Sequence, residues 1–411
     1  MPITRRSLFA RAAAAFAAGL LGPVRRLFAD DGGDLVVHEW GVLICRSGGL
    51  AGEGVDVASS FPPFVYSRRA DHRRFMAAYQ TALDTPIEID KPVVHFYGPE
   101  GKRVRFRTRF AEGLPLVWWP RAEWDETSLA WDVTLGAEPA VPVQAVERGH
   151  WFERLRATDS MYCQLGDQSE RFLYYDGESR YASPLGVRKA EGAYRVENTG
   201  REPALDVYLC ARAGEFVAWR SRLDPGESWV PAEPLGEDPV AHLAARLGEA
   251  GLTGAESSGL AEIWKDDFFA AERLVLVHRL ADGVYDRLLP AEVEPRPATF
   301  VRVGLALVAD QDPDLAEAVE ALLADLSADD YEARTRAEAE LSRIGRPALA
   351  ALARAEEGSR DAHVRHRARV IRLGIEGRAG GDAVSPELKA IYEEWKRTGR
   401  VDPYAVQGWG R

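Results

Sequence analysis

Residues 35–45 read Leu-Val-Val-His-Glu-Trp-Gly-Val-Leu-Ile-Cys, and this stretch decides how the fold is interpreted. Nearly every position is apolar except the adjacent pair His38 and Glu39. Because alternate residues of a strand face opposite sides, His38 and Glu39 point to different faces, and both faces are otherwise mostly apolar. The pattern predicts a central strand that is covered on both sides and against which the remaining sheet is built.

Glu39 poses an electrostatic problem, because an unpaired charge in such a strand is costly to bury. One interpretation is structural: Glu39 binds one arginine, and His38 binds a backbone carbonyl. The other is functional: one or both side chains face a cleft, where His95 and His150 on or beside other predicted strands could join them at a metal or catalytic site. The structural interpretation is favoured, because ion pairs that only support a fold also perturb ionisable groups.

The His-Glu-Trp-Gly motif at 38–41 resembles the opening motif of a family of uncharacterised exported bacterial proteins. Three further stretches carry the resemblance, and they are Lys-Pro-Val-Val-His-Phe-Tyr at 91–97, Glu-Gly-Leu-Pro-Leu-Val-Trp-Trp-Pro at 112–120, and Asp-Arg-Leu-Leu-Pro at 286–290 leading into Val-Arg-Val-Gly at 301–304. Family members usually continue the first motif with Thr-Phe, where this chain has Val42 and Leu43. The resemblance covers about residues 35–308. It implies a domain layout and brings no activity with it.

The N-terminus carries the most specific signal in the chain. Thr-Arg-Arg-Ser-Leu-Phe at 4–9 has the form of a twin-arginine export motif, and a run of small apolar residues follows at 12–21. That run is too short to span a membrane comfortably and Pro23 follows it closely, so a transmembrane helix is disfavoured. With a cleavage site after Ala29, residues 1–29 are predicted to be a signal peptide. We expect the mature chain to have no transmembrane segment and to lie in the periplasm or cell envelope.

Chain length indicates the number of domains, and net charge limits the classes of ligand. A chain of 411 residues is long enough for two or three domains with proper cores. The formal net charge is −12, and it becomes about −17 when the five arginines of the predicted signal peptide are subtracted. This balance argues against general nucleic-acid binding.

The strand and turn pattern predicts a mainly β fold with sandwich-like lobes, a helical insert and a helical C-terminal module. The predicted parts are an N-terminal β-rich lobe at 34–150, a second β-rich lobe at 151–310 with its helical insert at 238–270, a helical module at 312–376, and a linker, last helix and tail at 377–411. Within the module, Asp330 can cap a helix at 331–344, which Gly345 and Pro347 end. The spacing Arg-x-x-Ala-x-x-x-Leu at 334–341 resembles that of a short HEAT-type array. The last helix of the chain is predicted at 386–397.

Two clusters of side chains suggest ligands. The strand at 104–110 places four guanidinium groups on one face, and these are Arg103, Arg105, Arg107 and Arg109. Either they pair with carboxylates of this acidic protein, which is favoured, or they bind an anion. The aromatic residues Trp118, Trp119, Trp124 and Trp131 are expected in the core, with a stacking platform for carbohydrate as the alternative. Cys45, Cys163 and Cys210 are too few for a disulfide scaffold; they could be three buried thiols or one bridge and a free thiol.

No nucleophile elbow, phosphate-binding loop, dinucleotide fingerprint or tight metal motif appears in the sequence. The hypothesis is therefore an exported, non-catalytic binding or structural protein, with its metal and cofactor unassigned. A protein partner is expected at the C-terminal helices, and a carbohydrate or an anion is a secondary candidate ligand. The alternative is a twin-arginine-exported enzyme, which could depend on a metal, with a site near His38, Glu39 and His95.

The export signal gives the first prediction. Replacing Arg5 and Arg6 with lysines keeps the charge but removes the twin-arginine motif, so the precursor should accumulate in the cytoplasm. Cell fractionation and the mass of the mature chain measure this outcome. Normal export of the double-lysine variant would contradict the assignment.

Overall fold

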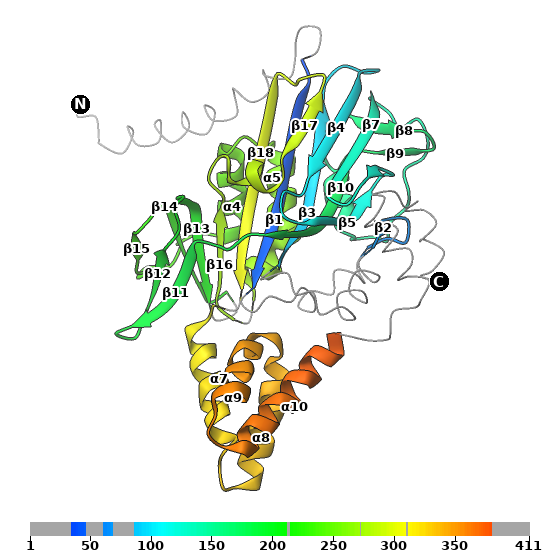
Figure 1. The fold of residues 1–411 in the computed structure, drawn as a ribbon. Coiled ribbons are helices and arrows are strands. Elements are labelled where there is room, and N and C mark those ends of the chain that lie inside the picture. Colours follow the sequence, from blue (N-terminus) through cyan, green and yellow to red (C-terminus); the bar gives the residue numbers. More distant parts are fainter. Residues whose placement is uncertain are drawn as a thin grey trace, which may run out of the picture.

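The computed structural model describes residues 34–46, 61–68, 86–211, 214–271, 273–309 and 311–379. Within these ranges the chain forms three β-sheets, helices packed against them, and a group of helices at the C-terminal end (Figure 1). The expectation of a mainly β fold with C-terminal helices is confirmed. The predicted signal peptide at 1–29 and the predicted last helix at 386–397 lie outside the described residues.

The largest sheet is built around β1 (Val36–Arg46), which corresponds to the predicted central strand. β1 pairs in parallel with β18 (Thr299–Ala309) on one edge and antiparallel with β3 (Pro86–Tyr97) on the other. Among the described residues this sheet has nine strands in the order β14-β13-β16-β18-β1-β3-β10-β5-β2. The remaining members are β2 (Tyr66–Ser67), β5 (Leu114–Trp119), β10 (Leu173–Arg180), β13 (Ala204–Ala211), β14 (Phe216–Leu223) and β16 (Val275–Arg279).

The predicted division into two β-rich lobes at residue 150 is wrong. β10 comes from the second predicted lobe, yet it lies between β3 and β5 of the first. β18 likewise comes from the end of the second predicted lobe and lies directly beside β1. The described residues of 34–309 therefore form one β body, because strands distant in sequence complete each other's hydrogen bonds and share a core.

A second sheet packs face to face on the first. Its strands run in the order β17-β4-β7-β8-β9, with the short β6 paired to β7. Their bounds are β4 (Arg103–Arg109), β6 (Glu123–Trp124), β7 (Ser128–Gly136), β8 (Tyr162–Leu165), β9 (Gln168–Glu170) and β17 (Ala291–Glu294). The rings of Phe106 on β4 and Phe96 on β3 lie 6.3 Å apart, and those of Trp131 on β7 and Tyr175 on β10 lie 6.2 Å apart. Large aromatic side chains thus fill the space between the two sheets.

Helices α4 (Pro239–Glu249) and α5 (Gly254–Phe269) lie against the other face of the large sheet (Figure 1). They confirm the helical insert predicted at 238–270. Asp238 caps the first, and Thr253 with Glu256 forms a reciprocal capping box on the second. Two short helices, α3 (Phe152–Arg156) and α6 (Val284–Leu288), and a small sheet of β11 (Leu185–Ala190), β12 (Ala193–Asn198) and β15 (Ser228–Trp229) complete the β body.

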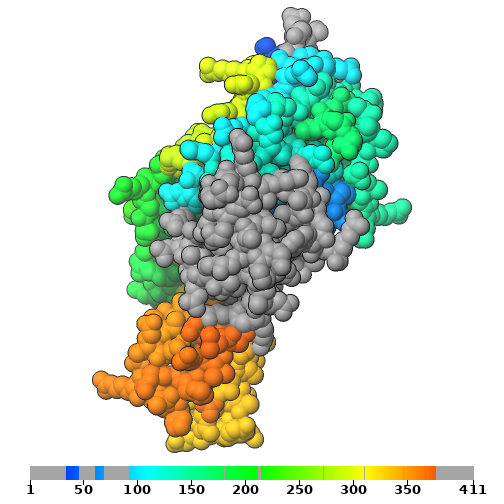
Figure 2. All heavy atoms as spheres, turned by 45° about the vertical axis from the view of Figure 1, so that its right-hand side comes forward, coloured from blue at the N-terminus to red at the C-terminus, as the bar shows by residue number. Residues whose placement is uncertain are grey.

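The C-terminal helices form a helical module (residues 313–379) with a core of its own, separate from that of the β body. Its helices are α7 (Pro313–Asp325), α8 (Tyr331–Ile344), α9 (Leu349–Gly358) and α10 (Ala362–Ala379). The helix predicted at 331–344 is confirmed together with its Asp330 cap, and Gly345 ends it with a positive φ of 71°. The module extends from one end of the β body (Figure 2). None of the helices in the described part of the chain is long and apolar enough to cross a membrane.

Candidate functional site

The motif residues of β1 and β18 are partners in a single parallel register. Glu39 pairs with Arg302 and Gly41 pairs with Gly304, so His-Glu-Trp-Gly at 38–41 lies residue by residue beside Val-Arg-Val-Gly at 301–304. Two of the stretches that carry the family resemblance are therefore one structural unit. That unit places a buried carboxylate and a guanidinium on the same face of neighbouring strands.

Arg302 holds Glu39 on the face that points toward the second sheet. Its Nε lies 2.8 Å from Glu39 Oε2, and its remaining nitrogens bind Asp286 Oδ1 at 2.6 Å and the carbonyl oxygen of Leu289 at 2.7 Å. Tyr175 donates its hydroxyl to the other oxygen of Glu39. The expectation that Glu39 binds one arginine is confirmed, and Asp-Arg-Leu-Leu-Pro at 286–290 supplies two further partners of that arginine.

The Glu39 carboxylate helps to set the protonation states of Arg302 and Tyr175. Burial opposes the charge of Arg302, but the Glu39 carboxylate outweighs it and keeps the pKa of Arg302 above its ordinary value. Burial and the negative charge of Glu39 both raise the pKa of Tyr175 well above its ordinary value. Tyr175 therefore stays protonated and donates, while Arg302 stays positive, so the Glu39 carboxylate has a partner on each oxygen.

The two motif glycines make room for the ring of Tyr285. A Cβ atom at Gly41 would lie 2.8 Å from the Tyr285 hydroxyl oxygen, and one at Gly304 would lie 3.0 Å from the Tyr285 ring. Since these glycines are register partners, they open a slot across both strands. The ring in that slot lies 4.8 Å from the guanidinium carbon of Arg302, a distance typical of a cation–π contact.

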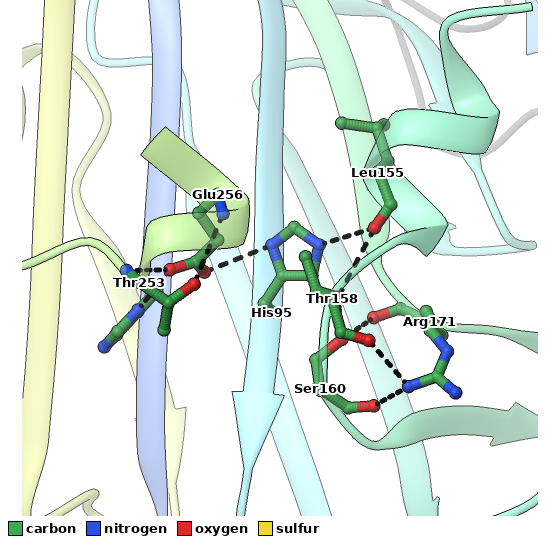
Figure 3. A network of polar contacts seen from close by, with 8 residues as sticks. His95, Leu155, Thr158, Ser160, Arg171, Thr253 and Glu256 are labelled. Atoms are coloured by element: carbon green, nitrogen blue, oxygen red, sulfur yellow. Dashed lines mark hydrogen bonds and ion pairs between the residues drawn. The ribbon is translucent and has the colours of Figure 1, made fainter. Parts of the chain in front are cut away.

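His38 points to the opposite face, toward the N-terminus of α5. It is paired across the strands with His95, and both rings approach the carboxylate of Glu256. Figure 3 shows His95 beside this carboxylate. His38 Nδ1 lies 2.7 Å from Oε2, and His95 Nδ1 lies 3.4 Å from Oε1. The backbone N–H of Thr253 donates to Oε2 at 2.7 Å, so the carboxylate that completes the α5 capping box also bridges two strands.

The hydrogen-bond partners identify one protonated ring nitrogen on each histidine. The carbonyl oxygen of Leu155, 3.2 Å from His95 Nε2, can only accept, so Nε2 carries the proton. Burial lowers the pKa of His95, and the negative charge of Glu256 opposes this shift. His38 Nδ1 carries the proton that it donates to Glu256. Burial opposes the charge of Glu256, but its bond with His38 and the nearby histidine charges lower its pKa below the ordinary value.

The polar network continues beyond His95 into the segment that follows α3. Thr158 also donates to the carbonyl oxygen of Leu155, at 3.4 Å, and its hydroxyl lies 2.8 Å from that of Ser160. Arg171 donates to the carbonyl oxygens of Thr158 at 2.9 Å and Ser160 at 2.7 Å (Figure 3). These bonds satisfy the backbone of a loop that packs against the sheet, which is a structural task.

The structure thus brings together two of the three proposed site residues. His38 and His95 share Glu256, whereas Glu39 lies on the other face of β1, and all three are at most 2% exposed. The prediction that His38 binds a backbone carbonyl is wrong, because Glu256 is its partner, while His95 makes such a contact. His150 lies elsewhere and accepts the backbone N–H of Phe152 at 3.1 Å. Within the described ranges no group of three or more His, Cys, Asp or Glu residues is arranged to hold a metal ion.

Nothing in the sequence indicates Glu256 as a partner of these histidines. Its local signal, Thr-x-x-Glu at 253–256, is a capping box that predicts the start of a helix. It does not predict that the same carboxylate reaches His38, which lies 218 residues away in the chain.

The arginine side chains of β4 form a solvated face, on which some of them pair with carboxylates. Side chains of β4 alternate between buried and more exposed positions as predicted. Arg105 binds Glu123 at 2.8 Å and also binds Asp132, and Arg107 lies 3.9 Å from Asp125. The interpretation that these arginines pair with the protein's own carboxylates is confirmed for Arg105 and Arg107, and it leaves less free charge for an anion.

The tryptophans do not form an exposed platform. Trp118, Trp119 and Trp131 are each 1% exposed, and Trp124 is half-buried beneath the guanidinium of Arg68. The carbohydrate-stacking alternative is therefore wrong for this row, because its faces are packed in the core. Cys45, Cys163 and Cys210 are buried and unbridged, which agrees with the interpretation of three buried thiols.

Comparison with known proteins gives no family. No family model and no curated protein matches the chain. Among solved structures, the Fcho1 mu homology domain of Danio rerio with bound Eps15 peptide is 9% identical and covers 68% of this chain and 98% of its own, with a TM-score of 0.25. The yeast delta-COP-I mu-homology domain complexed with a Dsl1 WxWxV peptide is 8% identical, with the same coverages and TM-score. Similarity at this score carries no argument about this chain.

The Glu39–Arg302 pair gives a prediction about stability. Glu39→Gln leaves a buried arginine without its carboxylate, so it should lower the free energy of unfolding by on the order of 3 kcal/mol. Asp286→Asn is a matched control, because it removes a 61% exposed partner of the same arginine and should cost less than about 1 kcal/mol. Urea unfolding of both variants measures the difference. Equal costs would show that the buried pair does not support the fold.

His278, a buried histidine on β16, gives a prediction about pH. Its Nδ1 and Nε2 contact the Arg279 carbonyl oxygen and the Ser183 hydroxyl, both at 3.3 Å, and burial lowers its pKa to about 4. Between its ordinary pKa of about 6.5 and this value, only the unfolded chain takes up the proton, so acidification destabilises the fold by about 1.4 kcal/mol per pH unit. The wild type should therefore lose about 2 kcal/mol more than His278→Gln between pH 7.5 and pH 5. Equal losses in urea unfolding would contradict this.

Proposed function

We propose that this chain is an exported protein of the periplasm or cell envelope that acts by binding or by structural support and not by catalysis. One observation carries the proposal: His38, Glu39 and His95 are buried, and each is paired within the fold. A catalytic group must come within hydrogen-bond reach of its substrate. These side chains instead join α5 and β18 to the central strand.

The proposed localisation in the periplasm or cell envelope rests on the sequence of residues 1–29. The twin-arginine motif, the short apolar run and the cleavage signal support export of the folded chain. The acidic balance of the remaining residues supports a role away from nucleic acid. The resemblance of the motif at 38–41 to an exported bacterial family points in the same direction.

The helical module is the proposed contact surface for a protein partner. An open groove of about 600 Å³ runs along α8 and is lined by Thr335, Glu338, Ala339, Ser342 and Arg343. These residues recur at intervals of one helical turn, so the groove presents small and charged side chains along one helix face. The pairing of α7 with α8 and of α9 with α10 is consistent with a short HEAT-like array, in which such a surface binds partners.

Metal content distinguishes this proposal from the alternative of an exported metal-dependent enzyme. Protein recovered from the periplasm without chelator should hold no stoichiometric metal, and added chelator should leave its unfolding midpoint unchanged. Metal content is also measured in two variants, His38→Gln and His150→Gln. The second is a control, because His150 lies outside the cluster of His38, His95 and Glu256. One metal equivalent per chain that is lost in His38→Gln and kept in His150→Gln would overturn the proposal.

A further inference from the structure

Three of the four large hydrophobic side chains that are exposed in the described ranges belong to the helical module. Val370 and Leu373 on α10 are 55% and 47% exposed, and Tyr331 at the start of α8 is 69% exposed. Val370 and Leu373 are three positions apart, so they lie on one side of α10 and form what we call the α10 stripe. The other side of α10 belongs to the module core, through Val364, Ala368, Ile371 and Ile375.

The α10 stripe is continuous with the groove on α8. Arg367, which is one turn before Val370, binds Glu338, and Glu338 lines that groove. Tyr331 is seven positions before Glu338 and therefore lies on the same side of α8. The stripe, the groove and Tyr331 thus form one surface across the two helices, which we call the α8–α10 face. Exposed apolar side chains beside a groove indicate a contact surface.

This face includes the most basic helix of the module. α10 has five arginines and one acidic residue, and its His363 and His366 are also exposed. The whole chain has a net charge of −12, so α10 differs in sign from most of the protein. Glu338 and Glu356 pair with arginines of α10 and balance only part of its positive charge. An occupant of the α8–α10 face should therefore combine an apolar centre with negative charge.

The helix across the module from α10 has these properties. α7 has four acidic residues and no basic one, and it lies on the opposite side of the module (Figure 1). The first turn of α7 is engaged with the β body, since Lys189 binds Asp314. In its last two turns Ala321, Ala324 and Asp325 are exposed, and we call these side chains the α7 face. The face is apolar at its centre and negative at the end of the helix, where the helix dipole adds negative charge.

We propose that the α8–α10 face of one copy of the chain binds the α7 face of a second copy. The α10 stripe packs against Ala321 and Ala324, whose short side chains let the two helices approach closely, and the positive charge of α10 lies beside Asp325. Residues 366–373 of α10 and 318–325 of α7 each span about 12 Å, so the two surfaces match in length. This inference rests on the proposed role of the helical module as a contact surface, and it names the partner.

Charge favours this pairing of unlike faces over a symmetric dimer. Two α10 helices in contact would bring arginines together, and two α7 helices in contact would bring carboxylates together. The α8–α10 face and the α7 face carry opposite charges instead. A contact between two different faces leaves one face of each kind free, so association is head to tail and continues beyond a dimer.

Sedimentation equilibrium of the purified full-length protein tests the proposal. The wild type should associate beyond a dimer as its concentration rises toward about 1 mM, because a contact of this size is at the weak end of protein interfaces. Leu373→Lys alters the α8–α10 face, and Ala321→Lys alters the α7 face. Each variant alone should need an about tenfold higher concentration to associate, because a charge enters the apolar centre of the contact.

An equimolar mixture of the two variants should form a dimer that does not grow further. The Leu373→Lys chain keeps an intact α7 face, and the Ala321→Lys chain keeps an intact α8–α10 face, so one contact remains possible. The two altered faces repel each other, because both carry an added lysine. A dimer in the mixture also shows that both variants are folded. Val230→Lys is the matched control, because Val230 is the exposed hydrophobic residue outside the module and this variant should associate like the wild type.

Four results would overturn the proposal. A monomeric wild type at about 1 mM would assign the stripe to another protein or to residues of this chain outside the described ranges. Association that is lost in Leu373→Lys and kept in Ala321→Lys would mean that two α10 stripes meet. A mixture that stays monomeric, or a loss of association in Val230→Lys, would exclude the assigned faces. None of these results would contradict the proposed function, which the metal measurement tests separately.

Discussion

The ion pair between Glu39 and Arg302 is the constraint on which the β body depends. A carboxylate on a strand with apolar faces cannot stay unpaired, because its desolvation would cost several kcal/mol. The partner arrives on β18, in register with Glu39 and 263 residues away in the chain. The same arginine also binds Asp286 and the Leu289 carbonyl oxygen, so one buried charge fixes β1, β18 and the segment around α6 together.

The packing around this pair accounts for the residues of the motifs at 38–41 and 301–304 without assigning them a catalytic role. Gly41 and Gly304 lack side chains where the Tyr285 ring crosses the two strands. On the opposite face, His38 and His95 hold the capping carboxylate of α5 against the sheet. The motif at 38–41 thus binds β18 and β10 through one face and the helical insert through the other. Its polar residues are engaged in holding these elements together, which is the basis for proposing a binding or structural role.

The helical module differs in physical character from the β body. Its helices α7 and α8 have side-chain caps, and the module has a core of its own. The hydroxyl of Tyr194 on β12 donates to Asp314 at 2.7 Å and links the module to the β body. Its exposed apolar side chains and its open groove lie on helices and not on the sheets. Among the described residues, the module thus carries three of the four large exposed hydrophobic side chains, which supports its proposed role as the surface for a partner.

Features that depend on local chemistry could be predicted from the sequence. The apolar run at 35–45 predicted a strand covered on both sides, alternation predicted the arginine face of β4, and Asp330 and Gly345 predicted the ends of α8. Each of these follows from periodicity or capping within a few residues. The sequence also predicted that Glu39 needs an arginine, because burial of a charge follows from the same local pattern.

Which distant residues contact one another depends on the packing of the whole chain. Parallel pairing of β1 with β18, the insertion of β10 between β3 and β5, and the bridge from His38 to Glu256 join segments far apart in the chain. No local pattern encodes such a register, so the predicted boundary at residue 150 and the predicted carbonyl partner of His38 were wrong. The physical reason is that a buried polar group accepts any complementary partner, and the packing of the whole chain selects the one that reaches it.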